Sequence, residues 1–203
     1  MRRFYATILC GVIFACIALP AAADTPAPLT AFATAWSSMN GYSTSIHCFN
    51  VKGSDQQNSV YQYSFTKPST ISMNIVSGPS AGNSVNWSGG DTVRAGHGMF
   101  TKNFALTDPT VTSLRGATVV DLSFGSILQH AQQTPGSMSV SQVNLGGATV
   151  NVVNLTPADP TKDNGLTREA LFLSTTTNLP VRVDGFEGSQ LVTSCSFSET
   201  SSS

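Results

Sequence analysis

Apolar and polar residues alternate along most of the chain, and the clearest run lies between Val60 and Gly98. Every second position there is apolar, as in Tyr61-Gln-Tyr63-Ser-Phe65. Such alternation indicates strands with one buried and one polar face. The Gly89-Gly90-Asp91 tract between two of these strands favours a tight turn, because glycine adopts positive φ without a Cβ clash. The sequence therefore predicts an antiparallel hairpin arrangement with an aromatic and Met-rich buried side.

The same pattern predicts five strands before a central helix and five after it. They span residues 43–52, 59–66, 70–76, 84–87 and 92–95, and then 138–145, 148–155, 167–174, 180–186 and 190–198. Tight turns are expected at Gly146-Gly147 and at Glu187-Gly188. Residues 98–120 contain scattered apolar positions, but Asp108-Pro109 and Arg115-Gly116 interrupt any regular element.

Two helices are predicted from apolar residues at helical spacing. The apolar positions are Leu29, Phe32, Trp36 and Met39 in the first helix, and Phe124, Ile127, Leu128 and Ala131 in the second. Gly41 is expected to cap the end of the first helix. The second helix should run from 122 to 133, with Asp121 or Ser123 at its start and Pro135-Gly136 after its end.

Short strands joined by tight turns indicate an α+β fold with a curled antiparallel meander. The two helices must bury their apolar sides, and the concave face of the sheet is the expected place. The chain shows no internal repeat. We expect one domain at 24–199, followed by a Ser-rich disordered tail at 200–203.

The N-terminus has the features of a secretory signal peptide. Met1-Arg2-Arg3 is basic, residues 5–19 are almost wholly apolar, and Ala21-Ala22-Ala23 provides small residues for cleavage after Ala23. This apolar run is too short for a permanent membrane span, and no later stretch approaches that length. The favoured localisation is therefore periplasmic. The alternative is a membrane-anchored lipoprotein, because the residues before Cys16 loosely resemble a lipoprotein box.

Charge and composition argue against several functions. The chain has 10 Lys and Arg against 11 Asp and Glu, a net charge of −1, so no basic footprint for nucleic acid is present. His47, His97 and His130 have no cysteine or carboxylate at metal-ligand spacing beside them. We predict a protein that is not an enzyme and that uses no metal or cofactor.

Cys48 and Cys195 remain after signal cleavage, one near the start of the first strand and one in the last. An exported compartment permits a disulfide. First and last strands come close together in a curled sheet, so we favour a Cys48–Cys195 bond over two separate buried thiols.

Ten aromatic and aliphatic residues form the apolar stripe of the predicted sheet and helices. They are Trp36, Met39, Tyr61, Tyr63, Phe65, Met73, Trp87, Phe124, Ile127 and Leu128. Such a stripe can fill a packed core. Because Met and aromatic side chains are adaptable, it can also line a hydrophobic cavity that accepts flexible acyl chains.

The order of elements and several short motifs resemble the superfamily of periplasmic lipoprotein carriers and receptors, LolA and LolB. The motifs are Lys67-Pro68 before a strand with Met73, the hairpin Val85-Asn-Trp87-Ser-Gly-Gly, the segment Thr177-Asn-Leu179-Pro180-Val181-Arg182, and Glu187-Gly188 before Leu191-Val192. The resemblance covers most of the mature chain. It implies an unclosed antiparallel β-barrel, helices that lid its concave face, and an apolar cavity that holds acyl chains.

Two features depart from this superfamily. No motif selects the arginine that latches the lid, for which Arg94, Arg115 and Arg168 are candidates. A disulfide between first and last strands would also stiffen a barrel that opens for cargo. The leading hypothesis is an exported carrier-type protein that binds lipid or lipoprotein acyl chains. The alternative is an envelope regulatory or interaction module on the same fold, which binds a protein partner.

Overall fold

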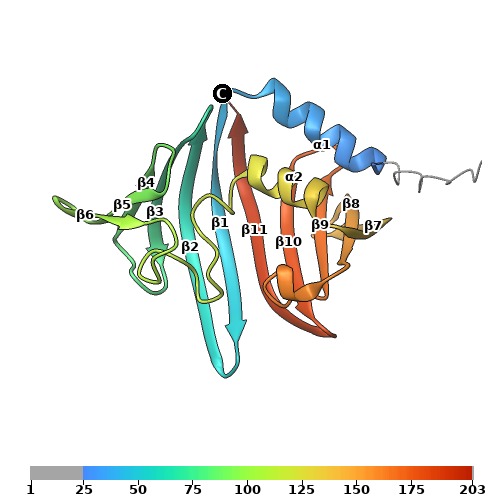
Figure 1. Ribbon diagram of the computed structural model, residues 1–203. Coiled ribbons are helices and arrows are strands. Elements are labelled where there is room, and N and C mark those ends of the chain that lie inside the picture. The colour runs from blue at the N-terminus through green and yellow to red at the C-terminus, as the bar shows by residue number, and fades with distance from the viewer. Residues whose placement is uncertain (1–24, 203) are drawn as a thin grey trace, which may run out of the picture.

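The computed structural model describes residues 25–202 (Figure 1). The predicted signal peptide, its cleavage site after Ala23 and the alternative lipidation site Cys16 lie outside the described residues. Within the described part of the chain, neither helix has the length and apolar character that a membrane crossing requires.

The described residues form two α-helices, one short 3-10 helix and eleven strands. In chain order they are α1 (Ala27–Ser38), β1 (Gly41–Lys52), β2 (Asp55–Thr66), β3 (Thr70–Ser77), β4 (Ser84–Trp87), β5 (Thr92–His97), β6 (Phe100–Ala105), α2 (Phe124–Gln133), β7 (Gly136–Leu145), β8 (Ala148–Pro157), η1 (Pro160–Lys162), β9 (Arg168–Ser174), β10 (Pro180–Glu187) and β11 (Gln190–Ser202).

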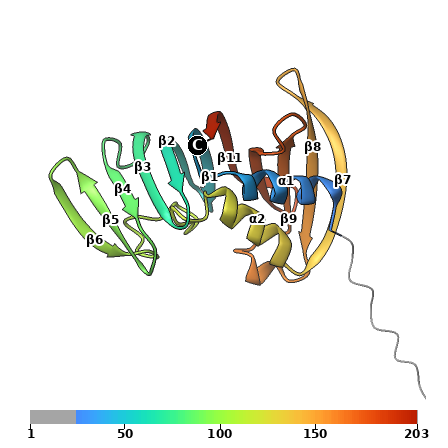
Figure 2. The ribbon, with the colours of Figure 1, turned by 90° about the horizontal axis from the view of Figure 1, so that it is seen from above.

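All eleven strands belong to one sheet in the order β6-β5-β4-β3-β2-β1-β11-β10-β9-β8-β7. The first and last strands pair at its centre, and β6 and β7 form its two edges, so the sheet does not close. Figure 2 shows that the sheet is curled and that α1 and α2 lie on its concave side. The predicted fold, an unclosed antiparallel barrel with helices over the concave face, is confirmed.

A disulfide joins the two central strands. Cys48 in β1 and Cys195 in β11 face each other directly in the strand register, and their Cα atoms are 4.1 Å apart. The predicted disulfide is confirmed. It covalently links the half of the sheet that runs from β1 to β6 to the half that runs from β11 to β7.

The end of α1 differs from the prediction that Gly41 caps it. The helix ends at Ser38, Met39 has an extended backbone, and Gly41 begins β1. A cation caps this end instead: Lys67 Nζ donates to the carbonyl oxygen of Trp36 at 2.7 Å. A positive charge is favourable at a helix C-terminus, and the same ammonium lies 4.4 Å from the centre of the Trp36 ring.

The predicted start of the second helix is confirmed at Ser123, whose hydroxyl accepts a hydrogen bond from Ser126 N–H at 3.1 Å. Gly125 in the first turn allows α2 to approach α1 closely. A Cβ added there would lie only 2.9 Å from Trp36 Cζ2. The indole ring of Trp36 in α1 therefore packs directly against Gly125 in α2.

Two further elements differ from the sequence prediction. Residues 100–105, expected to be irregular, form edge strand β6, paired with β5 along its whole length. Residues 200–202, expected in a disordered tail, extend β11, and Ser201 and Ser202 pair with Ser43 and Tyr42 of β1. Hydroxyl contacts support this pairing, because Ser43 Oγ and Ser201 Oγ are 2.8 Å apart. Neither residues 100–105 nor residues 200–202 show regular apolar alternation. Each segment is extended because its backbone pairs with a neighbouring strand, β5 or β1.

Candidate ligand-binding site

A cavity of about 870 Å³ lies between the concave face of the β1–β6 half of the sheet and residues 106–123, which we call the covering segment. The covering segment connects β6 to α2 and passes in front of β1 and β2 (Figure 1). The sheet supplies the floor of the cavity, and the covering segment supplies its roof.

The wall of the cavity is largely apolar because strand alternation brings one set of side chains to the concave face. From the sheet these are Tyr61, Met73, Ile75, Val85, Ala95 and Phe104, and from the covering segment Val111, Val119 and Leu122. The Cys48–Cys195 disulfide also lines the cavity. Burial raises the pKa of the Tyr61 phenol above its ordinary value.

The charged lining residues all have the same sign. Lys52 and Lys102 are both exposed and line the cavity, and the lining set within residues 25–202 contains no Asp or Glu. Asn50, which also lines the cavity, accepts a hydrogen bond from the Thr193 hydroxyl at 3.0 Å. The cavity therefore combines an apolar interior with a rim that attracts negative charge.

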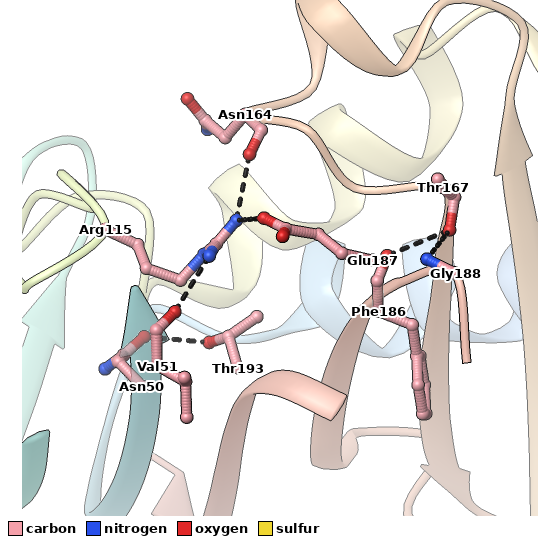
Figure 3. Close-up of polar contacts among 9 residues, drawn as sticks. All are labelled: Asn50, Val51, Arg115, Asn164, Thr167, Phe186, Glu187, Gly188 and Thr193. Carbon is pink, nitrogen blue, oxygen red and sulfur yellow. Dashed lines mark hydrogen bonds and ion pairs between the residues drawn. The ribbon is translucent and has the colours of Figure 1, made fainter. Parts of the chain in front are cut away.

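The covering segment is held by Arg115 (Figure 3). The guanidinium donates to the Val51 carbonyl oxygen at 2.8 Å and to the Asn164 carbonyl oxygen at 2.9 Å. It also pairs with Glu187 Oε1 at 2.5 Å. These partners belong to β1, to the loop before β9 and to β10, so one side chain ties the covering segment to both halves of the sheet.

Two hydrogen bonds secure other points of the covering segment. Leu114 N–H donates to Gln57 Oε1 at 2.6 Å, and Tyr63 Oη donates to the Val119 carbonyl oxygen at 3.2 Å. The other candidate latch residues have other contacts: Arg94 Nε donates to Thr101 at 2.7 Å, and Arg168 lies 3.6 Å from the Phe186 ring centre. Only Arg115 of the three belongs to the covering segment.

The ten residues of the predicted apolar stripe all belong to one hydrophobic core. Tyr61 and Met73 line the cavity, and the other eight do not. Among the eight, Trp36, Trp87 and Ile127 are half-buried, and the rest are buried. The structure thus brings the stripe together, and a ligand-binding role for its members stays a prediction.

Most of these eight lie where the helices contact each other and the sheet, rather than around the cavity. The Tyr42 and Phe124 rings stack with centres 4.1 Å apart, and Trp36 lies 5.3 Å from Phe65. Phe124 N–H donates to Tyr42 Oη at 3.0 Å. This aromatic cluster fixes the first turn of α2 and, through it, the end of the covering segment.

Sequence reasoning missed the covering segment, although one signal was available. Loops longer than about 12–15 residues without secondary structure are uncommon in compact domains and often serve function. The stretch between β6 and α2 exceeds that length and contains Val111, Val119 and Leu122. These apolar residues have no helix or strand period because they face the cavity from an irregular backbone.

A second group of polar residues lies outside the cavity, at the far end of α2. His130 Nε2 is 2.7 Å from Glu169 Oε1 in β9 and 3.4 Å from Asp163 Oδ1 after η1. The hydrogen bond to Glu169 raises the pKa of His130. Burial, followed by the Glu169 charge, raises the pKa of Asp163 to about 6. The sequence showed no carboxylate beside this histidine, and the fold supplies two.

The sequence matches no protein-family model and no curated protein. Solved structures match at low identity. Lipoprotein LppX from Mycobacterium tuberculosis is 9% identical, with a TM-score of 0.46, over 86% of this chain and 93% of that chain.

A LolA superfamily protein from Nitrosomonas europaea is 9% identical, with a TM-score of 0.38, over 84% of this chain and 91% of that chain. The MucA/MucB complex of Pseudomonas aeruginosa matches with 12% identity and a TM-score of 0.43, over 86% of this chain and 56% of that chain.

Proposed function

We propose that this protein is an exported carrier-type protein that binds an acyl chain bearing an anionic head group in the cavity beneath the covering segment, without covalent chemistry. The observation that carries the proposal is an apolar cavity whose charged lining residues, within the described part of the chain, are both lysines. The resemblance of the sequence to periplasmic lipoprotein carriers supports the same reading.

The size and lining of the cavity suit a lipid tail. Its volume of about 870 Å³ falls within the roughly 300–1,000 Å³ typical of small-ligand sites. Each methylene moved out of water contributes about 0.8 kcal/mol. About ten buried methylenes would therefore contribute about 8 kcal/mol, before the entropy costs of ordering the chain and the protein.

The head group would lie at the rim, near Lys52 and Lys102. Both ammonium groups are exposed, so they interact with a carboxylate or phosphate in water and add selectivity more than affinity. A ligand with an apolar tail and an anionic head group would place the tail against the apolar interior and the head group near the two lysines. A cationic head group would be repelled by the same lysines.

The test is a fluorescent fatty-acid titration of the mature protein, followed by displacement with unlabelled ligands of equal chain length. We expect saturable binding and displacement by the fatty acid at several-fold lower concentration than by the corresponding alcohol. A Lys52→Gln, Lys102→Gln double variant should abolish this difference while it still binds the alcohol. Absence of saturable uptake by the parent protein, confirmed by native mass spectrometry, would reject the proposal.

Arg115→Met should speed the release of bound lipid. Methionine keeps the apolar part of the side chain and removes every hydrogen bond that holds the covering segment through this residue. Hydrogen bonds to charged groups contribute about 1.5–3 kcal/mol each in net terms. Glu187 is 46% exposed, so the two carbonyl contacts matter most.

We expect Arg115→Met to raise the dissociation rate of a bound fluorescent fatty acid about tenfold, equivalent to about 1.4 kcal/mol, in stopped-flow measurements. Arg94→Met is the matched control, because Arg94 is exposed and bonds only to neighbouring β6. Equal dissociation rates in the parent and Arg115→Met would show that the covering segment does not gate the cavity.

A second candidate function, recognition of an envelope protein, is favoured by the tip of the β5–β6 hairpin. Met99 and Phe100 there are 94% and 86% exposed. Exposed apolar side chains grouped at a loop tip are typical of interaction sites. If this tip binds a protein, Met99→Ser should weaken cross-linking to that partner in envelope extracts and leave fatty-acid affinity unchanged.

A further inference from the structure

The cluster of His130, Asp163 and Glu169 brings three potential metal ligands together from three separate elements. His130 lies in the last turn of α2, Asp163 directly follows η1, and Glu169 lies in β9. One nitrogen or oxygen from each residue lies within 4.8 Å of the other two. The shortest separation, from His130 Nε2 to Glu169 Oε1, is 2.7 Å.

The charges of this cluster do not balance. Two carboxylates face a single imidazole, which supplies at most one positive charge, and Asp163 has no lysine or arginine partner among residues 25–202. The Asp163 side chain is only 7% exposed. Its Oδ2 atom is buried without a hydrogen-bond partner. A buried, unpartnered carboxylate oxygen is costly unless a cation or donor reaches it.

Thr134 contacts the imidazole beside the cluster. Its Oγ1 lies 3.3 Å from His130 Nδ1 and 3.5 Å from His130 Nε2, so the hydroxyl is near both ring nitrogens. Nε2 also lies 2.7 Å from Glu169 Oε1. The His130 side chain is 44% exposed, which leaves room for a water molecule as a fourth ligand.

We propose that His130, Asp163 and Glu169 bind a divalent transition-metal ion of the zinc class. One imidazole nitrogen and two carboxylate oxygens are a donor set that suits Zn²⁺, whereas Mg²⁺ prefers oxygen ligands alone. At metal–ligand distances of about 2.0–2.1 Å, tetrahedral ligands lie about 3.3 Å apart. The His130 and Glu169 ligand atoms, now 2.7 Å apart, would therefore separate by about 0.6 Å. The bound ion would fasten α2 to β9 and to the η1 turn.

The experiment uses the mature protein, without a histidine tag and freed of metal by a chelator. Isothermal titration with ZnCl2 is expected to show one site per chain and a raised melting temperature, because an ion that binds only the folded state stabilises it. His130→Gln, Asp163→Asn and Glu169→Gln should each weaken binding at least tenfold. His47→Gln and His97→Gln are the matched controls, since both histidines are exposed and outside the cluster.

Absorption spectroscopy of the zinc edge provides a readout that does not depend on the variants folding. One imidazole and two carboxylate ligands at about 2.0–2.1 Å support the proposal. Three outcomes would overturn it: no stoichiometric Zn²⁺ binding, binding lost in the His47 or His97 variants instead, or equal affinity for Mg²⁺. The first of these would leave the cluster as an ion pair only. The metal site and the lipid cavity use different residues, so either can fail without the other.

Discussion

Replacing both Cys48 and Cys195 by alanine is expected to lower the free energy of unfolding by about 5 kcal/mol. The two cysteines are 147 residues apart in sequence, so their bond closes a loop that contains most of the mature chain. In the chain-entropy account, a loop of that length removes a large part of the conformational freedom of the unfolded state. This stabilisation is comparable to the whole stability of many domains.

Urea denaturation of the double variant and of the parent, followed by circular dichroism, measures this difference. The parent treated with a thiol reductant is the matched control and should lose a similar amount. A loss below about 1 kcal/mol in both would mean that the unfolded chain is already restrained, or that the disulfide strains the folded sheet enough to cancel its benefit.

The position of this bond also bears on how a ligand could enter. It joins β1 to β11, the seam between the two halves of the sheet, and it lines the floor of the cavity. The sheet therefore cannot open along this seam while the bond is intact. In the proposed carrier, access would instead involve movement of the roof, where the Arg115 side chain holds the covering segment. A stiff floor and a releasable roof are compatible with carriage.

The strands were predictable where burial imposes alternation. Tyr61, Tyr63 and Phe65 in β2 face the concave side, and the intervening residues face outward, as the sequence indicates. Edge strand β6 gives no such signal, because Phe100 and Lys102 are both exposed and only Phe104 packs inward. This strand forms because its backbone pairs with β5. Backbone hydrogen bonds can be made by almost any residue type, so this pairing leaves no pattern in the sequence.

The location of the cavity could not be predicted from the same pattern. Apolar side chains show the same spacing along the chain whether they pack in a core or line a cavity. Met73 lines the cavity and Phe124 does not, and this difference depends on the path of residues 106–123. The choice among three arginines was equally open. The main partners of Arg115 are the carbonyl oxygens of Val51 and Asn164, and any residue type offers a carbonyl.

The polar cluster at the end of α2 escaped sequence reasoning for a different reason. His130, Asp163 and Glu169 are too far apart along the chain to form a recognisable motif. They meet because α2 crosses the concave face and ends above β9. Tertiary folding alone produces such a constellation, whereas Ser123 at the start of the same helix could be predicted from local capping rules.

The largest expected effect on binding comes from Ala95→Phe, which should weaken fatty-acid binding at least tenfold. Ala95 lies in β5, between Val85 and Lys102 of the neighbouring strands, and lines the cavity. A phenyl ring there would occupy space that the ligand needs. Overpacking a filled core costs about 1–3 kcal/mol. A ring that enters an existing cavity avoids most of this cost, so the melting temperature should stay within a few degrees of that of the parent.

Fluorescent fatty-acid titration and thermal melting of the same preparation measure both quantities. Ala105→Phe is the matched control. Ala105 is exposed in β6 and does not line the cavity, so this substitution adds the same ring outside the cavity. The companion variant Ile127→Glu tests the predicted apolar stripe beneath the helices. If Ala95→Phe binds normally while Ile127→Glu loses uptake and remains folded, the ligand lies among Trp36, Phe124 and their neighbours, and the cavity beneath the covering segment is not the binding site.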